Sequence, residues 1–75
     1  MYELHTKFGA GTFETAQDVL NALSLLLPYA DISFNDPDFF SEKESILQRA
    51  EEQLEQDAFW ESKGLLSGLF TIIRS

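Results

Sequence analysis

Apolar and polar residues alternate along the first segment of the chain. In residues 2–8, Tyr2, Leu4 and Phe8 fall on one side, and polar residues stand between them. A period of two is typical of a half-buried strand with one face in water. The glycines of segment 9–11 break this alternation, because glycine permits backbone angles that other residues rarely adopt. We therefore predict one strand that ends at these glycines.

A helical period follows the glycines. Thr12 is a suitable N-cap, and Glu14 suits the first turn because the N-terminal end of a helix carries partial positive charge. Apolar residues then recur three and four positions apart and form one wide stripe. The stripe consists of Phe13, Ala16, Val19, Leu20, Leu23, Leu26 and Leu27. Pro28 disfavours helical geometry in the residue before it, so we predict that this helix ends near Leu26.

The middle of the chain combines turn residues with a helix start. The letters DISF at 31–34 are compatible with a short strand, and the NDPD that follows is typical of a turn. Ser41 and Glu44 match the S-x-x-E capping box, which predicts the start of a second helix. Its apolar seam is narrow and consists of Ile46, Leu47, Ala50, Leu54 and Ala58. Gly64 is the predicted stop.

The C-terminal segment completes the predicted fold. Residues 69–75, LFTIIRS, are rich in β-branched and apolar side chains and predict a final strand. A helix from residue 65 onward is the alternative. The predicted order is therefore β-α-β-α-β. We expect a single domain, residues 1–75, of the α+β class, with two helices packed on a two- or three-stranded sheet.

Composition restricts the class of protein. Cysteine is absent, which excludes disulfides and thiolate metal sites. No apolar run reaches the roughly 18 residues of a membrane span. The N-terminus lacks the basic start and apolar run of a signal peptide. We therefore expect a cytoplasmic protein that does not bind membranes.

Charge is distributed unevenly along the chain. The net charge is −8, from 13 acidic and 5 basic residues. Residues 1–30 carry −2, residues 31–61 carry −8, and residues 62–75 carry +2. A negative field disfavours direct binding to nucleic acid and attracts basic surfaces. The expected partner is therefore a Lys/Arg-rich protein surface.

The sequence offers little support for catalysis. His5 is the only histidine, and its strand position places it with polar neighbours on the wet face. A general base needs a positioned neighbour and a pocket, and no nucleophile motif accompanies His5. The segment FGAGT at 8–12 lacks the remaining residues of a phosphate-binding loop. We expect a protein that is not an enzyme and that has no cofactor.

One metal-binding alternative remains open. Residues 31–42 can be aligned with a 12-residue calcium loop, with Asp31 at its first position and Glu42 at its last. The glycine required at the sixth position is replaced by Asp36, and Pro37 follows. An acidic turn before a helix explains the same residues. The alternative function is a calcium- or small-ligand-binding domain that uses this turn.

The segment EEQLEQDAFWE, residues 51–61, contains five carboxylates and no basic residue. Glu51 and Glu55 are four residues apart, and such a like-charge pair costs about 0.2–0.5 kcal/mol in an isolated helix. Carboxylates at this spacing lie roughly 6 Å apart, a spacing that resembles that of phosphates along a nucleic-acid strand. A row of this kind fits a groove of Arg and Lys. An acidic surface that only aids solubility is the alternative explanation.

We expect the partner-binding surface to combine carboxylates with aromatic anchors, because interfaces commonly surround apolar anchors with a charged rim. The candidate residues are Asp36, Asp38, Phe39, Glu44, Glu51, Glu52, Glu55, Asp57, Trp60 and Glu61. In size and charge the chain resembles the small acidic proteins with which phages and mobile elements block host nucleic-acid enzymes, such as anti-restriction and anti-CRISPR proteins. This resemblance implies a nucleic-acid mimic that occludes a basic groove. It assigns no role to any single residue.

A protein–protein interaction module is the second alternative. Residues 69–75 would form an edge strand that pairs with a partner sheet or with a second copy in a homodimer.

Overall fold

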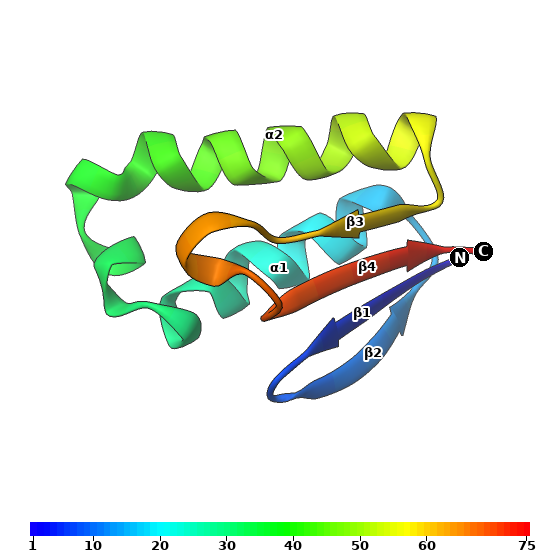
Figure 1. Cartoon of the computed structure of the whole chain (residues 1–75), viewed down its shortest axis with the longest axis horizontal. Coiled ribbons are helices and arrows are strands. Elements are labelled where there is room, and N and C mark those ends of the chain that lie inside the picture. Colours follow the sequence, from blue (N-terminus) through cyan, green and yellow to red (C-terminus); the bar gives the residue numbers. More distant parts are fainter.

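The structure is a computed structural model that describes residues 1–75, apart from the side chain of Leu65. A four-stranded antiparallel sheet forms one layer, with strand order β2-β1-β4-β3, and two helices cover one of its faces (Figure 1). The elements are β1 (Tyr2–Thr6), β2 (Gly9–Phe13), α1 (Ala16–Ala30), α2 (Phe40–Gln56), β3 (Phe59–Glu61) and β4 (Phe70–Arg74). The predicted α+β class is confirmed, although the sheet has four strands and the order is β-β-α-α-β-β.

The first correction concerns residues 9–13, which form β2 and not a turn into a helix. A tight hairpin joins β1 to β2: the Thr6 hydroxyl donates to the Gly9 carbonyl and accepts from the Phe8 N–H, both at 3.0 Å. Gly9 has φ +135°, an angle that favours glycine. The predicted N-cap at Thr12 is therefore wrong. Thr15 caps α1 instead, accepting the Asp18 N–H at 3.1 Å.

The second correction concerns the end of the first helix. Helix α1 continues through Pro28 to Ala30, and the Asp31 N–H closes it on the carbonyl of Leu27 at 3.1 Å. The predicted end at Leu26 is therefore wrong. Proline lacks the N–H that would bond the preceding turn, and its ring crowds the carbonyl four residues earlier. The helix ends only two residues after Pro28. Burial of Leu27 in the core offsets the cost of the proline.

Two short 3-10 helices connect α1 to α2. Ile32–Asn35 forms the first, so the strand predicted at 31–34 is wrong. The carboxylate of Asp31 accepts the N–H of Ser33 at 3.0 Å and fixes its start. Pro37–Phe39 forms the second, capped by Asp36. Aspartates that bond the backbone two residues on favour turns over strands.

Both ends of the second helix also differ from the prediction. Helix α2 begins at Phe40 without a side-chain cap, so Ser41 lies inside the helix and the capping box is not formed. The helix ends at Gln56, not near Gly64, and residues 59–61 form β3. Pairing of β3 with β4 decides this end, because cross-strand contacts outweigh local helix propensity.

The predicted C-terminal strand is confirmed as β4, but it lies inside the sheet between β1 and β3. The alternative of a C-terminal helix is therefore wrong, and so is the prediction that this segment forms a free edge. The open edges belong to β2 and β3. Met1 and Ser75 also exchange backbone hydrogen bonds, of 3.2 and 2.9 Å, so the two ends of the chain lie side by side (Figure 1).

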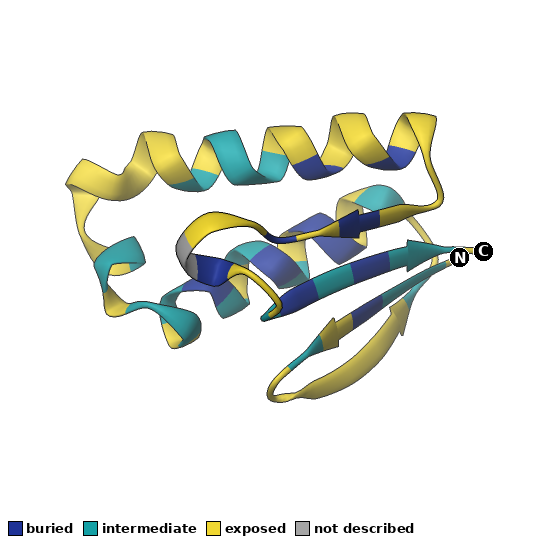
Figure 2. Cartoon of the chain, viewed as in Figure 1, coloured by how far each residue is buried: buried dark blue, intermediate teal, exposed yellow. Residues whose placement is uncertain are grey.

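The core lies between the sheet and the helices. Figure 2 shows buried positions along α1 and β4 and on the side of α2 that faces the sheet. The buried apolar residues are Leu4, Val19, Leu20, Leu23, Leu27, Ala50, Leu54, Trp60, Leu66, Phe70 and Ile72. The centres of both predicted helical stripes are therefore confirmed. None of the described helices is long and apolar enough to cross a membrane.

Candidate functional site

Helix α2 divides into an apolar side and a charged side. Ala50 and Leu54 are buried against the core, and Ile46 and Leu47 are partly buried beside them. This narrow seam repeats at three and four positions, so most of the helix circumference is left to solvent. The charged side therefore needs no further element to fold over it.

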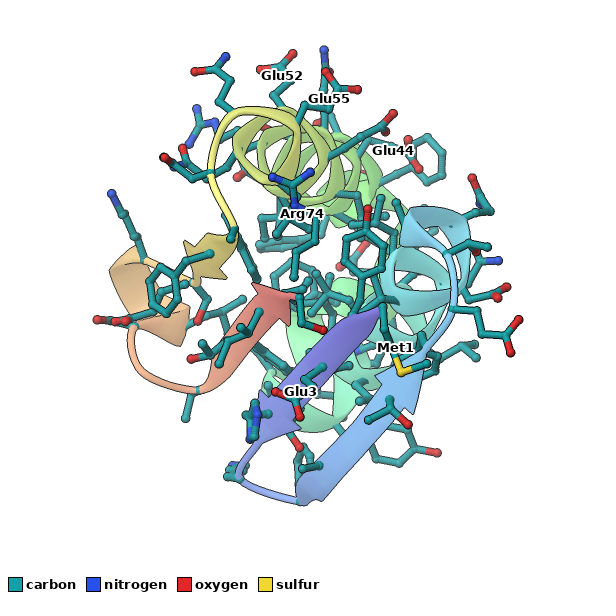
Figure 3. All side chains as sticks on the ribbon, turned by 90° about the vertical axis from the view of Figure 1, so that its right-hand side faces the viewer. Met1, Glu3, Glu44, Glu52, Glu55 and Arg74 are labelled. Atoms are coloured by element: carbon teal, nitrogen blue, oxygen red, sulfur yellow. The ribbon has the colours of Figure 1, made fainter. Side chains whose placement is uncertain are left out.

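Four glutamates occupy the charged side of α2, and we call them the acidic face: Glu44, Glu51, Glu52 and Glu55. All four are exposed. Glu44, Glu51 and Glu55 are spaced seven and four residues apart, which aligns them along one stripe about 16 Å long. Figure 3 shows Glu44, Glu52 and Glu55 pointing away from the sheet, whereas Glu3 lies on the other side of the molecule.

The acidic face is not neutralised within the chain. Among the described side chains, the sole contact within 4.0 Å between an acidic and a basic group joins Glu3 to His5, at 3.8 Å and on the exposed sheet face. Arg74 points from β4 toward the helix layer (Figure 3), but it forms no such pair. The negative potential of the four glutamates therefore extends into solvent.

A shallow groove accompanies the acidic face. Its volume is about 410 Å³, and the four glutamates line it together with Leu47 and Gln48. The Gln48 amide donates to Glu52 at 3.2 Å, which holds one carboxylate in position along the helix. The groove thus presents carboxylate oxygens over a small apolar floor.

The other predicted carboxylates lie apart from this face. Asp36 and Asp38 belong to the 3-10 helix that precedes α2. Asp57 caps the opposite end of α2 and accepts a hydrogen bond from Gln53. Glu61 is exposed on β3, in the sheet layer. The structure therefore gathers four of the eight predicted carboxylates and distributes the others around both ends of the helix and the sheet.

The two predicted aromatic anchors differ in exposure. Phe39 is 37% exposed, and its ring meets that of Phe34 edge to face, with centroids 6.3 Å apart. Trp60 is only 9% exposed and packs in the core opposite Ile72. Because its side chain belongs to the core, the expected surface anchor is not found at Trp60. The neighbouring Phe59 is 47% exposed instead.

The turn proposed for calcium has a different geometry. The Asp31 carboxylate accepts both the N–H and the hydroxyl of Ser33, at 3.0 and 2.8 Å. These hydrogen bonds, the backbone one first, hold the pKa of Asp31 below its ordinary value. Asp36 is engaged in the same way with the N–H of Asp38. Within the described part of the chain, no three His, Asp or Glu side chains are grouped as metal ligands. This arrangement gives the calcium alternative no support.

Another hollow lies between α2 and the edge strand β3. It has a volume of about 710 Å³, and Trp60 and Leu66 contribute to its walls. Two basic residues, Arg49 and Lys63, stand in it near Glu52 and Glu61. The hollow therefore carries charges of both signs, and Glu52 lines both this hollow and the groove of the acidic face.

A second exposed surface was not predicted from the sequence. Leu25, Tyr29 and Ile32 are 72, 74 and 81% exposed, and Phe8 is 52% exposed. The rings of Phe8 and Tyr29 meet edge to face at 6.3 Å, so the hairpin tip and α1 contribute to one surface. One signal was present in the sequence, since Leu25 falls outside the apolar stripe of its helix.

Comparison with models of protein families, with curated proteins and with solved structures finds no match for this chain. Its function must therefore be inferred from its own residues.

Proposed function

We propose that this protein is a non-enzymatic inhibitor that binds, through the acidic face of α2, a Lys/Arg-rich groove of a nucleic-acid-handling protein. The carboxylates of Glu44, Glu51, Glu52 and Glu55 take the places of phosphates in that groove. Phage and mobile-element proteins of the anti-restriction and anti-CRISPR type are the class that this proposal implies. The protein would act in the cytoplasm, where such enzymes work.

One observation carries the proposal: the acidic face is exposed, aligned and unpaired within the chain. The like-charge pair Glu51–Glu55 costs a few tenths of a kcal/mol on a helix. A lysine at either position would remove that cost and still keep the protein soluble. A small domain has little stability to lose, so a contact made by these residues explains why they are kept.

Electrostatic steering gives this proposal a kinetic signature. Opposite charges raise the rate of association, and added salt screens them. We expect the association rate to fall steeply with ionic strength, while the dissociation rate changes less. Nucleic acid should compete with the protein, because both would occupy the same groove.

The test is capture of partners from the native host at low salt, with elution along a salt gradient. The double variant Glu51→Lys/Glu55→Lys should lose the captured protein. The control Glu3→Lys/Glu61→Lys makes the same change in net charge on the sheet, and it should retain that protein. Duplex DNA or RNA added in excess should release the partner.

Two results would contradict the proposal. If both double variants bind alike, the position of the charges does not matter and only the overall charge does. If excess nucleic acid leaves the complex intact, the partner is not held through a nucleic-acid groove. Melting curves must show that both variants are folded at the temperature of the binding assay, so that loss of binding is not loss of fold.

A further inference from the structure

The edge strand β2 lacks the features that protect most open edges. Its five residues, Gly9–Phe13, include no charged residue and no proline. Four of the five are exposed. Natural sheets cover such edges, or place lysine, proline or a bulge there, because unpaired backbone groups bind other strands. An unprotected edge of this length therefore indicates that another strand covers it.

The free backbone groups of β2 can be identified from the ladder. Met1 and Ser75 form a hydrogen-bonded pair at the start of the β1–β4 pairing. Hydrogen-bonded pairs occur at every second residue of an antiparallel pair, so the backbone groups of the odd-numbered residues of β1 point to β4 and those of the even-numbered residues point to β2. Leu4 therefore bonds its partner Gly11. By the same alternation, the N–H and C=O groups of Ala10 and Thr12 point outward from the sheet.

Gly11 has no evident role inside the single chain. It does not adopt a positive φ. An added Cβ would meet only the ring of Phe13, at 3.5 Å, which is an ordinary contact. Glycine in a strand interior costs stability, and it often marks a place where another backbone approaches closely.

The apolar surface described above adjoins this edge. Phe8 lies in the hairpin turn directly before β2, and Tyr29 packs on it from α1. Leu25 lies one turn before Tyr29 on the same side of the helix and is 72% exposed. An open edge therefore continues into an apolar surface, which is the combination that strand pairing between proteins requires.

The distribution of charged residues indicates which partner binds at the β2 edge. Helix α1 and strand β2 together contain one charged residue, Asp18, whereas ten of the 13 acidic residues lie in 31–61. Two copies of a protein with net charge −8 repel each other at most surfaces. Strand β2 lies at the edge of the molecule opposite α2 (Figure 1), so two copies can pair there without opposing the acidic faces of their α2 helices.

We propose that two copies of this chain form a twofold dimer through β2, with the axis at Gly11. Antiparallel pairing then sets Ala10 against Thr12 of the second copy, and the reverse, with four backbone hydrogen bonds. The same register brings Phe8 opposite Glu14 of the second copy. The Lys7 ammonium lies over the Phe8 ring, 5.2 Å from its centroid, so that carboxylate also comes near Lys7. Opposite charges therefore meet at both ends of the paired strands.

The paired surface is small. A five-residue strand pair with a few apolar side chains falls at the lower end of specific interfaces, below about 1,200 Å² in total. We expect a dissociation constant on the order of tens of micromolar. The dimer does not depend on the acidic face of α2, so its test is separate from that of the proposed function.

Sedimentation of the purified chain over a range of concentrations tests the dimer. The molecular weight should rise from one chain to two, and the variant Thr12→Pro should remain a monomer, because it removes an outward N–H. The matched control Glu61→Pro removes an N–H on the other open edge, β3, and should still dimerise. A monomer at about 1 mM, well above the expected dissociation constant, would overturn the proposal. A dimer that Glu61→Pro disrupts and Thr12→Pro does not would also overturn it.

A charge exchange tests the register without changing the backbone. Lys7→Glu and Glu14→Lys should each weaken the dimer about three- to tenfold, because each sets like charges together. The double variant Lys7→Glu/Glu14→Lys should restore it to near the original strength. If the two effects simply add, the residues do not meet across the axis and the register is wrong.

Discussion

Asp31 shows how a single side chain directs the course of the chain. Its backbone N–H ends α1 by donating to the Leu27 carbonyl, and its carboxylate starts the first 3-10 helix by accepting two hydrogen bonds from Ser33. Those bonds stabilise the charged form, which lowers the pKa of Asp31. The turn and the ionisation of this residue are therefore linked.

A pH dependence follows from that link. The folded pKa lies below the unfolded value of 3.8, so the stabilisation is complete above that value and is lost as the pH falls through the folded pKa. Asp31→Asn keeps a capping side chain but cannot ionise. We expect its urea midpoint to fall less than that of the unmodified protein between neutral pH and about pH 3. Equal acid sensitivity would contradict the role of Asp31.

At this scale the sequence predicts some exposures well and others poorly. His5 was expected on the wet face and is found there, since alternation along β1 decides it. Trp60 was expected at the surface and is buried, because its exposure depends on β3, an element that the sequence did not indicate. Side-chain placement is predictable only where the element that carries it is predicted.

Helix α2 has charges that oppose its own dipole. Its last turn contains no basic residue and does contain Glu55, although the C-terminal end of a helix favours positive charge. Its first turn contains Glu42, which suits that end. The acidic face therefore costs stability mainly near Gln56, where the helix ends.

This arrangement predicts opposite effects at the two ends. Glu55→Lys should raise the free energy of unfolding by about 0.5–1 kcal/mol, because it removes a like-charge contact and complements the dipole. Glu42→Lys makes the same charge change and should lower it by a similar amount. Urea denaturation at low salt measures both effects, and added salt should reduce them. If both variants shift in the same direction, net charge and not position is the cause.

Element interiors were predictable here, and element ends were not. The stripes of α1 and α2 repeat over several turns, and their centres are buried as expected. The ends depend on tertiary pairing: β2 needs β1, and β3 needs β4. The acidic face was predictable because it depends only on helical spacing, whereas the surface at β2 required the strand order.

Pairing of the first strand with the last completes the sheet. Strands β1 and β4 are neighbours at the centre of the sheet, yet they lie at opposite ends of the described chain. Forming this pair restricts nearly the full length of the unfolded chain, and the entropy cost of closure rises with loop length. Closing this pair therefore costs more chain entropy than closing any of the shorter loops of the sheet.

Joining the ends tests that conclusion. A short glycine linker from Ser75 to Met1 spans residues that already bond each other. The cyclic chain should gain about 2–4 kcal/mol in free energy of unfolding, because closure restricts its unfolded state. A linear chain carrying the same linker is the control, and urea denaturation is the measurement. No gain would mean that the ends are not paired in solution.

The interior position of β4 also matters while the protein is being made. A ribosome that has not yet released Phe70 holds a chain in which β1 has one neighbour, and the apolar residues beneath the helices have no cover on that side. Translation must therefore proceed almost to the last of these residues before the domain can close. Until β4 has been made, the nascent chain exposes apolar side chains of the kind that chaperones bind.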